Sequence, residues 1–278
     1  MRPILILAIL LARWSASVAC AQEPNQRDQP KEAKPDASLD EMRGLAQRTR
    51  MEVFAFQQDE KREARLHESP LFRYSDEPRF IKDSTLWIWT ERGRLVAIQK
   101  IENSFYSPTS PTWTYCFASL SEEFVRAAWP NVPAFETTKP GVVFAPVPVA
   151  PNPGKEKTAW DRQFREISRH FSGKSFYELD KFEETFRLLP RPLYEYEAKD
   201  FGILSGKIFG LASGTNSSAF LVVELRQAKD HPPQWQFAAV QMTNAGVAVF
   251  HDDKKVWTAG PQLRPGQFGN WTYMFLPK

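Results

Sequence analysis

The most constraining feature of this 278-residue chain is a strand-like segment that recurs at a fixed distance along the sequence. Residues 86–121 hold two apolar stretches and a third that begins at Trp113, and residues 208–243 keep this order with Trp235 in the matching place. Adding 122 to a position in the first segment gives its match in the second without a gap. Stretches this rich in β-branched and aromatic residues are typical of strands, so the recurrence predicts two similar antiparallel meanders. The alternative is two unrelated meanders that share common strand residues.

Helical patterns precede both segments. Ser38 and Glu41 fit an S-x-x-E capping box, and a second pattern runs between Pro153 and Gly173, which suit a first helical position and a C-terminal cap. Each pattern keeps apolar residues on one face: Met42 and Leu45 in the first, and Trp160, Phe164, Ile167 and Phe171 in the second. We therefore predict an α+β fold made by tandem duplication, each half with one helix packed on an antiparallel β-meander of about five strands.

The N-terminus has the composition of a secretory signal peptide. Arg2 precedes an apolar run over residues 3–12, and Ala19-Cys20-Ala21 fits the small-x-small cleavage pattern. The run is too short to span a bilayer. These features predict an exported protein, periplasmic or extracellular, that is cleaved after Ala21 and keeps no transmembrane segment. The alternative is cleavage before Cys20 and a lipid anchor on that cysteine.

Composition divides the rest of the chain into three parts. Residues 22–37 are polar and contain several prolines, so we predict a disordered linker. Residues 38–150 form the first predicted half, which ends in a proline-rich connector, and residues 151–278 form the second half. Signal cleavage leaves Cys116 as the one cysteine, and its place in the middle of a strand predicts a small buried residue rather than a nucleophile.

Charge and motifs exclude several classes of function. The formal net charge is +3 with 25% charged residues, which gives no bulk electrostatic case for binding nucleic acid. The sequence contains no H-E-x-x-H, paired C-x-x-C, G-x-G-x-x-G or G-x-S-x-G motif. The four histidines are scattered, and the Asp252-Asp253 pair is typical of a turn. We therefore predict no catalytic, cofactor-binding or metal-binding residue, and no cofactor.

One pair of carboxylates is the exception that could support catalysis. Glu102 and Glu224 stand at matching strand ends, 122 residues apart. Two carboxylates that face each other across an aromatic cleft would suit glycoside hydrolysis. The alternative is two solvated glutamates at strand ends, with the nine tryptophans filling the core rather than lining a groove.

Several blocks of the sequence resemble a large family of exported proteins in planctomycete bacteria. These blocks follow the family's order and are Pro70–Asp76, Gln163–Ser172, Leu188–Tyr196 and Gly214–Asn216. The resemblance covers Ser69 to Thr258, and it departs where the family usually has Asp-Gly before the third strand, since Asp83-Ser84 and Ser205-Gly206 stand there instead. It implies export and a shared architecture, and it transfers no catalytic residue.

Taken together, these observations favour an exported, non-catalytic binding or structural protein of the cell envelope or extracellular space. Its partner would be an unknown envelope or extracellular component, such as a peptide or a glycan. The competing hypothesis is a glycosidase-like hydrolase that uses Glu102 and Glu224. Catalytic sites usually leave a cluster of polar residues in the sequence, and the recurring residues here are those that shape and pack.

Overall fold

The computed structural model describes residues 36–55, 60–105, 112–130, 133–178, 181–262, 266–267 and 269–277. The chain divides into two units, Met1–Pro35 and Asp36–Lys278, and every described residue belongs to the second. The predicted signal peptide, with Cys20 and its cleavage site, and nearly all of the predicted linker therefore lie outside the described residues.

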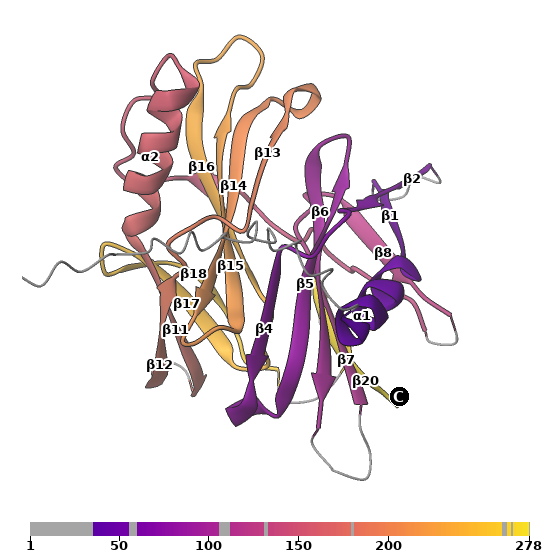
Figure 1. The fold of residues 1–278 in the computed structure, drawn as a ribbon. Helices are drawn as coiled ribbons and strands as arrows, with labels where there is room; N and C mark the ends of the chain where they lie inside the picture. Colours follow the sequence, from indigo (N-terminus) through magenta and orange to yellow (C-terminus); the bar gives the residue numbers. More distant parts are fainter. Residues whose placement is uncertain are drawn as a thin grey trace, which may run out of the picture. The chain divides into compact units, whose positions relative to one another are not determined.

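Antiparallel strands dominate the second unit and form two large sheets (Figure 1). The first has the order β19-β20-β7-β6-β5-β3, with β4 also paired to β5. Its strands are β3 (Arg65–Leu66), β4 (Phe72–Asp76), β5 (Ile81–Glu91), β6 (Arg94–Ser104), β7 (Thr112–Ser119), β19 (Gly266–Gln267) and β20 (Trp271–Pro277).

The second large sheet has the order β10-β16-β15-β14-β12-β11-β17-β18, with β13 also paired to β14. Its strands are β10 (Ala145–Pro146), β11 (Phe171–Glu178), β12 (Lys181–Leu188), β13 (Tyr194–Ala198), β14 (Ile203–Ala212), β15 (Ser217–Arg226), β16 (Gln234–Gln241), β17 (Gly246–His251) and β18 (Lys254–Ala259). The last two form the hairpin that the Asp252-Asp253 pair predicts.

A smaller sheet, two helices and two short 3-10 turns complete the described part of the chain. The small sheet has the order β2-β1-β8-β9. The elements are α1 (Ala37–Gln47), β1 (Arg50–Phe54), β2 (Lys61–Glu63), η1 (Glu77–Arg79), β8 (Phe124–Ala128), β9 (Phe135–Glu136), α2 (Lys157–Arg169) and η2 (Lys199–Phe201).

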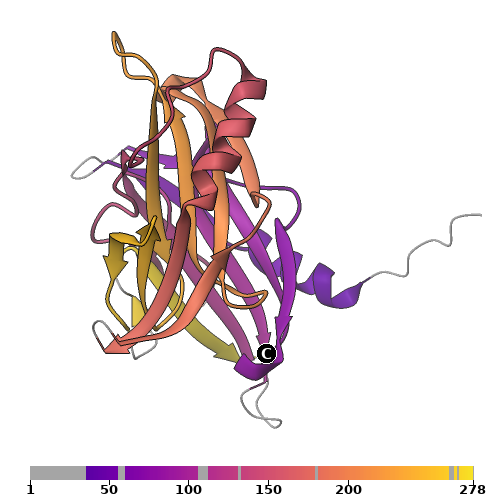
Figure 2. The same ribbon diagram turned by 90° about the vertical axis from the view of Figure 1, so that its left-hand side faces the viewer.

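Successive side chains of a strand point to opposite faces of its sheet. Because successive residues of the long strands are apolar, both faces of each large sheet carry apolar side chains. One face of β5, β6 and β7 shares a core with one face of β14, β15 and β16, in which Ile98 and Phe220 are fully buried. On its other face the first sheet packs against α1 and the small sheet through Met42 and Trp87. The other face of the second sheet packs against α2 through Phe164, and Figures 1 and 2 show α2 running along it.

The predicted fold class, an α+β protein of two helix-on-meander halves, is wrong. The protein is mostly β, with several antiparallel sheets that form a half-barrel and with only two α-helices in the described part. The physical reason is long-range pairing. Ala145–Pro146, a segment that looks like a connector, adds to β16 because its backbone groups find partners there, about 90 residues further along the chain.

The helix ends also differ from expectation. Asp36, not Ser38, caps α1, since its side chain accepts from the backbone of Leu39, while the Ser38 hydroxyl donates to Asp83 at 2.7 Å. Helix α2 is shorter than the range 153–173, because Phe171 and its neighbours pair with β17 as strand β11. The predicted apolar faces of both helices are nevertheless packed against the sheets.

The register of strand pairing recurs at a spacing of 122 residues, and this relation positions the site described next. Positions that differ by 122 have the same pairing partners in the two large sheets, and we call them matching positions. Examples are Tyr74 with Ser84 and Glu102 with Thr114 in the first sheet, and Tyr196 with Gly206 and Glu224 with Gln236 in the second.

Candidate functional site

Strand β6 places a lysine and a glutamate side by side in the core between the large sheets. Lys100 and Glu102 are two residues apart and therefore share one face of the strand. Their exposed fractions are 2% and 6%, which is unusual for charged residues. Burial of such groups requires partners that replace water.

Glu102 has one such partner among the described residues. The hydroxyl of Tyr74 donates to Glu102 Oε1 at 2.7 Å, across from β4. The second carboxyl oxygen, Oε2, accepts no hydrogen bond from any described residue. Burial raises the pKa of Glu102, and burial together with the nearby carboxyl raises the pKa of Tyr74 well above its usual value.

Lys100 is held by the other large sheet rather than by Glu102. Its Nζ donates to Asn216 Oδ1 at 2.7 Å and to the backbone oxygen of Ser217 at 2.5 Å. Both acceptors are neutral, and burial lowers the pKa of Lys100. The lysine thus ties β6 to the start of β15 and uses two of its three N–H groups to do so.

A pocket of about 270 Å³, which we call the Glu102 pocket, opens beside these side chains. It has a polar wall on β6 and the loops of the second sheet and an aromatic wall on β20. Trp271 and Tyr273 stack there with ring centroids 5.8 Å apart. The lining residues are Arg79, Ile81, Lys100, Glu102, Thr114, Cys116, Asn216, Met242, Thr243, Asn244, Trp271, Tyr273 and Phe275.

The matching position in the second sheet, Glu224, has a fuller set of partners. It accepts hydrogen bonds from the hydroxyl of Tyr196 on Oε1 and from Nε of Arg226 on Oε2. Arg226 also donates to Glu122 Oε2 at 2.7 Å, and its guanidinium carbon lies 3.7 Å from the ring centroid of Phe144. Burial would lower the pKa of Arg226, but its bonds to Glu122 and Glu224 keep that pKa above its usual value.

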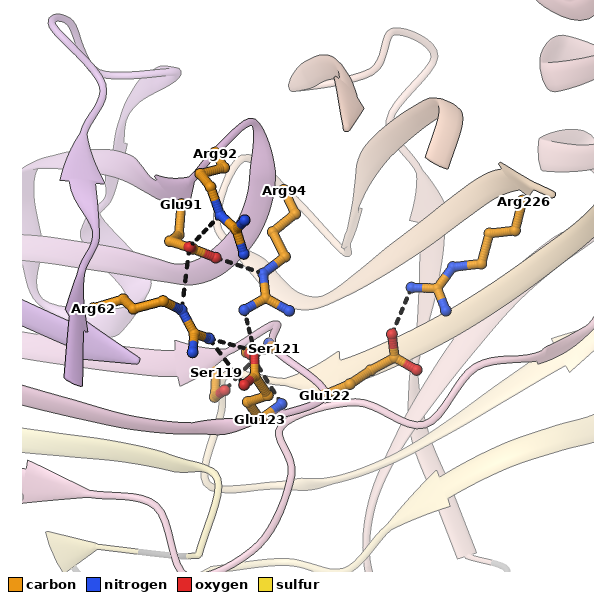
Figure 3. A network of polar contacts seen from close by, with 9 residues as sticks. All are labelled: Arg62, Glu91, Arg92, Arg94, Ser119, Ser121, Glu122, Glu123 and Arg226. Atoms are coloured by element: carbon orange, nitrogen blue, oxygen red, sulfur yellow. Dashed lines mark hydrogen bonds and ion pairs between the residues drawn. The ribbon is translucent and has the colours of Figure 1, made fainter. Parts of the chain in front are cut away.

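A cluster of charged side chains lies next to Arg226 (Figure 3). Arg62 contacts Glu91 at 3.2 Å and Glu123 at 2.7 Å, and Arg94 contacts both of the same carboxylates. Burial would raise the pKa values of Glu91 and Glu123, but the arginines outweigh it and hold both below their usual range. Every arginine in this cluster therefore has an acidic partner, and the cluster is structural.

The two carboxylates proposed as a catalytic pair have different surroundings. Both are buried, so neither is a solvated glutamate at a strand end. Glu102 lines the Glu102 pocket, whereas Glu224 is not among its lining residues and is bonded to Arg226. The carboxyls therefore do not face that pocket together, as a pair of glycosidase carboxylates must face one substrate.

Two further features are the buried Cys116 and a second, larger pocket. Burial raises the pKa of the Cys116 thiol well above its usual value, which makes it a poor nucleophile. A pocket of about 820 Å³ lies between the proline-rich connector and α2, with Trp160 and Trp235 in its walls. Lys155 is the one charged residue among the described residues that line this pocket, so the pocket provides few groups that could react.

Sequence reasoning found Glu102 but missed the residues that define its site, namely Lys100, Tyr74 and Asn216. Two signals were present. Lys100 and Glu102 are charged residues two apart in a strand whose central residues are mostly apolar. The Pro70–Tyr74 and Pro192–Tyr196 blocks each place a tyrosine 28 residues before the matching glutamate.

Among the described residues, no helix is both long and apolar enough to cross a membrane. Within the same ranges, no group of three or more His, Cys, Asp or Glu side chains is placed to hold a metal ion.

Comparison with known proteins gave no match: no family model matches the chain, and neither curated proteins nor solved structures yielded a similar one. The resemblance to exported planctomycete proteins therefore stays a prediction.

Proposed function

We propose that this chain is an exported, non-catalytic binding protein whose ligand occupies the Glu102 pocket. The observation that carries the proposal is the state of Glu102. This carboxyl is buried, yet its Oε2 has no hydrogen-bond partner among the described residues, whereas Oε2 of Glu224 has one. Tyr74 is the one described hydrogen-bond partner of Glu102, and a ligand in the pocket would supply a contact to Oε2.

The surroundings of the pocket support binding better than turnover. Its lysine is held by two oxygens, and its thiol has a pKa well above the usual value because of burial. Catalysis requires a base or nucleophile that is positioned and free to react. A pocket with aromatic side chains on one wall and a few polar groups on the other is typical of small-ligand binding.

Retention of a small molecule tests this function. The protein is incubated with a small-molecule extract of the producing cells and passed rapidly through a desalting column, and retained compounds are identified by mass spectrometry. We expect a compound that is retained with its mass unchanged and lost in Thr243→Trp, which fills the pocket from a loop. Lys229→Trp, an exposed loop change, serves as the control. Retention that is equal in both variants, no retention by wild type, or release of a product would contradict the proposal.

Export is tested separately. The mature protein is isolated from its native host and its intact mass is measured. We expect the mass that follows from cleavage after Ala21, because the sequence there fits a signal peptidase site. A diacylglyceryl group on Cys20 would indicate the lipoprotein alternative, and a mass that retains residues 1–21 would refute export.

A further inference from the structure

We propose that the Glu102 pocket binds a guanidinium group, carried either by a free small molecule or by an arginine side chain of a peptide. This inference rests on the proposed function, since it names the chemistry of the ligand in that same pocket. It comes from the second large sheet, where the protein itself places a guanidinium at the matching site.

Three side chains hold the guanidinium of Arg226. Glu224 and Glu122 accept its N–H groups, and Phe144 lies against its face. Two carboxylates and an aromatic face are the contacts that a planar, five-donor cation prefers. The guanidinium of Arg226 therefore occupies a complete binding site within the protein.

The counterparts of all three contacts line the Glu102 pocket. Glu102 matches Glu224 and Asn244 matches Glu122, each at a spacing of 122 residues. The counterpart of Phe144 is Tyr273, which follows from pairing rather than spacing. Phe144 precedes Ala145, the partner of Phe237, and Tyr273 precedes Met274, the partner of Tyr115, which is the match of Phe237.

The arginine itself has no counterpart. The position that matches Arg226 is Ser104, a buried residue whose short side chain bonds Thr114 Oγ1 at 2.7 Å. The Glu102 pocket is thus lined by the counterparts of both acceptors and of the aromatic residue, but the cation has no counterpart. A ligand guanidinium would bond Glu102 Oε2 and the side-chain oxygen of Asn244 and would lie near Tyr273.

Two cations near the pocket already have partners of their own. Lys100 donates to neutral oxygens of the second sheet, and it forms no ion pair with Glu102 among the described residues. Arg79 pairs with Asp76 at 2.8 Å and with Glu184 at 3.0 Å. Neither takes the place of Arg226, although the charge of Lys100 weakens the attraction of the site for a second cation.

Calorimetric titration with matched compounds tests this inference. The probes are free L-arginine and N-acetyl-L-arginine methylamide, which mimics an arginine within a peptide. L-Citrulline and its acetylated methylamide are neutral controls of the same shape. We expect at least one arginine compound to bind about tenfold or more tightly than its citrulline match, because a charge-assisted bond to Glu102 is lost in the urea. Tighter binding of the methylamide would indicate a peptide, and tighter binding of free arginine a small molecule.

Two substitutions assign the site. Glu102→Gln keeps the shape of the side chain and should weaken arginine binding by about tenfold or more. In Ser104→Arg the new side chain should bond Glu102 as Arg226 bonds Glu224, so the folded variant should no longer bind arginine. If that variant does not fold, Tyr273→Ala should instead weaken binding several-fold, since the aromatic contact is lost.

The outcomes separate this inference from the proposed function. Citrulline compounds that bind as tightly as arginine compounds, arginine affinity unchanged in Glu102→Gln, or no binding of either arginine probe would overturn the guanidinium assignment. The proposed function would still stand if wild type retains another compound that Thr243→Trp does not retain. Loss of both results would overturn both.

Discussion

The two large sheets bury the same carboxyl and phenol pair but complete it differently. In the second sheet Glu224 is bonded to Tyr196 and to Arg226, and Arg226 is held in turn by Glu122. In the first sheet Glu102 is bonded to Tyr74 and lines a pocket. One residue explains most of the difference, because Ser104 stands where the second sheet has an arginine. The same strand pairing can therefore produce either a closed structural ion pair or an open site.

A second difference concerns how the sheets meet. Asn216 receives Lys100 from the first sheet at 2.7 Å. Its matching position is Arg94, whose guanidinium carbon lies 4.1 Å from the ring centroid of Phe201 in η2, just before β14, and whose N–H groups bond Glu91 and Glu123. Both connections cross between the sheets, but only the first borders the Glu102 pocket. The open site therefore lies where Lys100 and the Arg79–Glu184 ion pair join the two halves of the chain.

The largest expected effect comes from opening the closed site. Arg226→Ser would leave Glu224 buried without its cation, and we expect the free energy of unfolding to fall by about 3 kcal/mol. Urea denaturation at pH 7 measures this change. Low concentrations of a guanidinium salt should restore part of the loss, since the ion can enter the vacated place. A loss below about 1 kcal/mol would show that Glu224 does not depend on its arginine.

The next effect concerns the glycine that faces the tyrosine of the closed site. A Cβ at Gly206 would lie 2.4 Å from the Tyr196 ring, whereas the matching Ser84 is accommodated beside Tyr74. Gly206→Ser should therefore destabilise the protein by about 1–3 kcal/mol through overpacking. Gly214→Ser is the control, because a Cβ there meets nothing within 4 Å. Equal melting temperatures for the two variants would argue against tight packing at Tyr196.

A smaller effect is expected from neutralising the open site. Glu102→Gln should change the free energy of unfolding by less than about 1 kcal/mol, because the carboxyl has no cation in contact and an amide oxygen can still accept from Tyr74. Glu224→Gln should cost more, since it weakens the bond to Arg226. Chemical denaturation of the two variants side by side tests this order. A larger loss in Glu102→Gln would mean that Lys100 depends on this carboxylate.

The smallest expected effect is a dependence of ligand affinity on pH. Burial raises the pKa of Glu102, so the carboxyl loses its proton at a higher pH than usual, and only the ionised form attracts a guanidinium. Lys100, whose pKa burial lowers, loses its repulsive charge as pH rises. Affinity should therefore increase several-fold from about pH 5 to pH 8. The other titratable groups around Glu102 are Tyr74, Asp76, Arg79, Cys116 and Tyr273. Calorimetry that shows affinity falling over this range would contradict the assignment.

The sequence predicted the long strands well, because their runs of β-branched and aromatic residues are a local signal. It also identified Glu102 and Glu224 as matching positions and placed the hairpin at Asp252-Asp253. It could not predict the order of the strands in the sheets. Short strands such as β8 and β10 form only by pairing with strands that are distant in the sequence. The predicted fold class was wrong for that reason. Both helix starts also shifted: the Asp36 side chain caps α1 in place of Ser38, and α2 begins at Lys157 without a side-chain cap.

The site was harder to predict than the fold. Nothing near Lys100 in the sequence indicates that Asn216 receives it, because that contact exists only once the two sheets are packed. Glu102 also lacks an arginine partner because Ser104 stands at the position that matches Arg226. Nothing in Ser104 itself indicates this role. A comparison of matching positions could have found that difference, but its meaning requires the pocket.

The most direct test of the central claim is the titration of the Glu102 carboxyl by carbon NMR, with Glu102→Gln used to assign the signal. In the free protein we expect a pKa above the usual range for glutamate, because the carboxyl is buried. Saturation with the tighter-binding arginine probe should lower that pKa, because a bound guanidinium stabilises the ionised form. The matching citrulline compound should leave it unchanged. A Glu102 pKa that stays the same with the arginine probe would contradict the assignment of this pocket as a guanidinium-binding site.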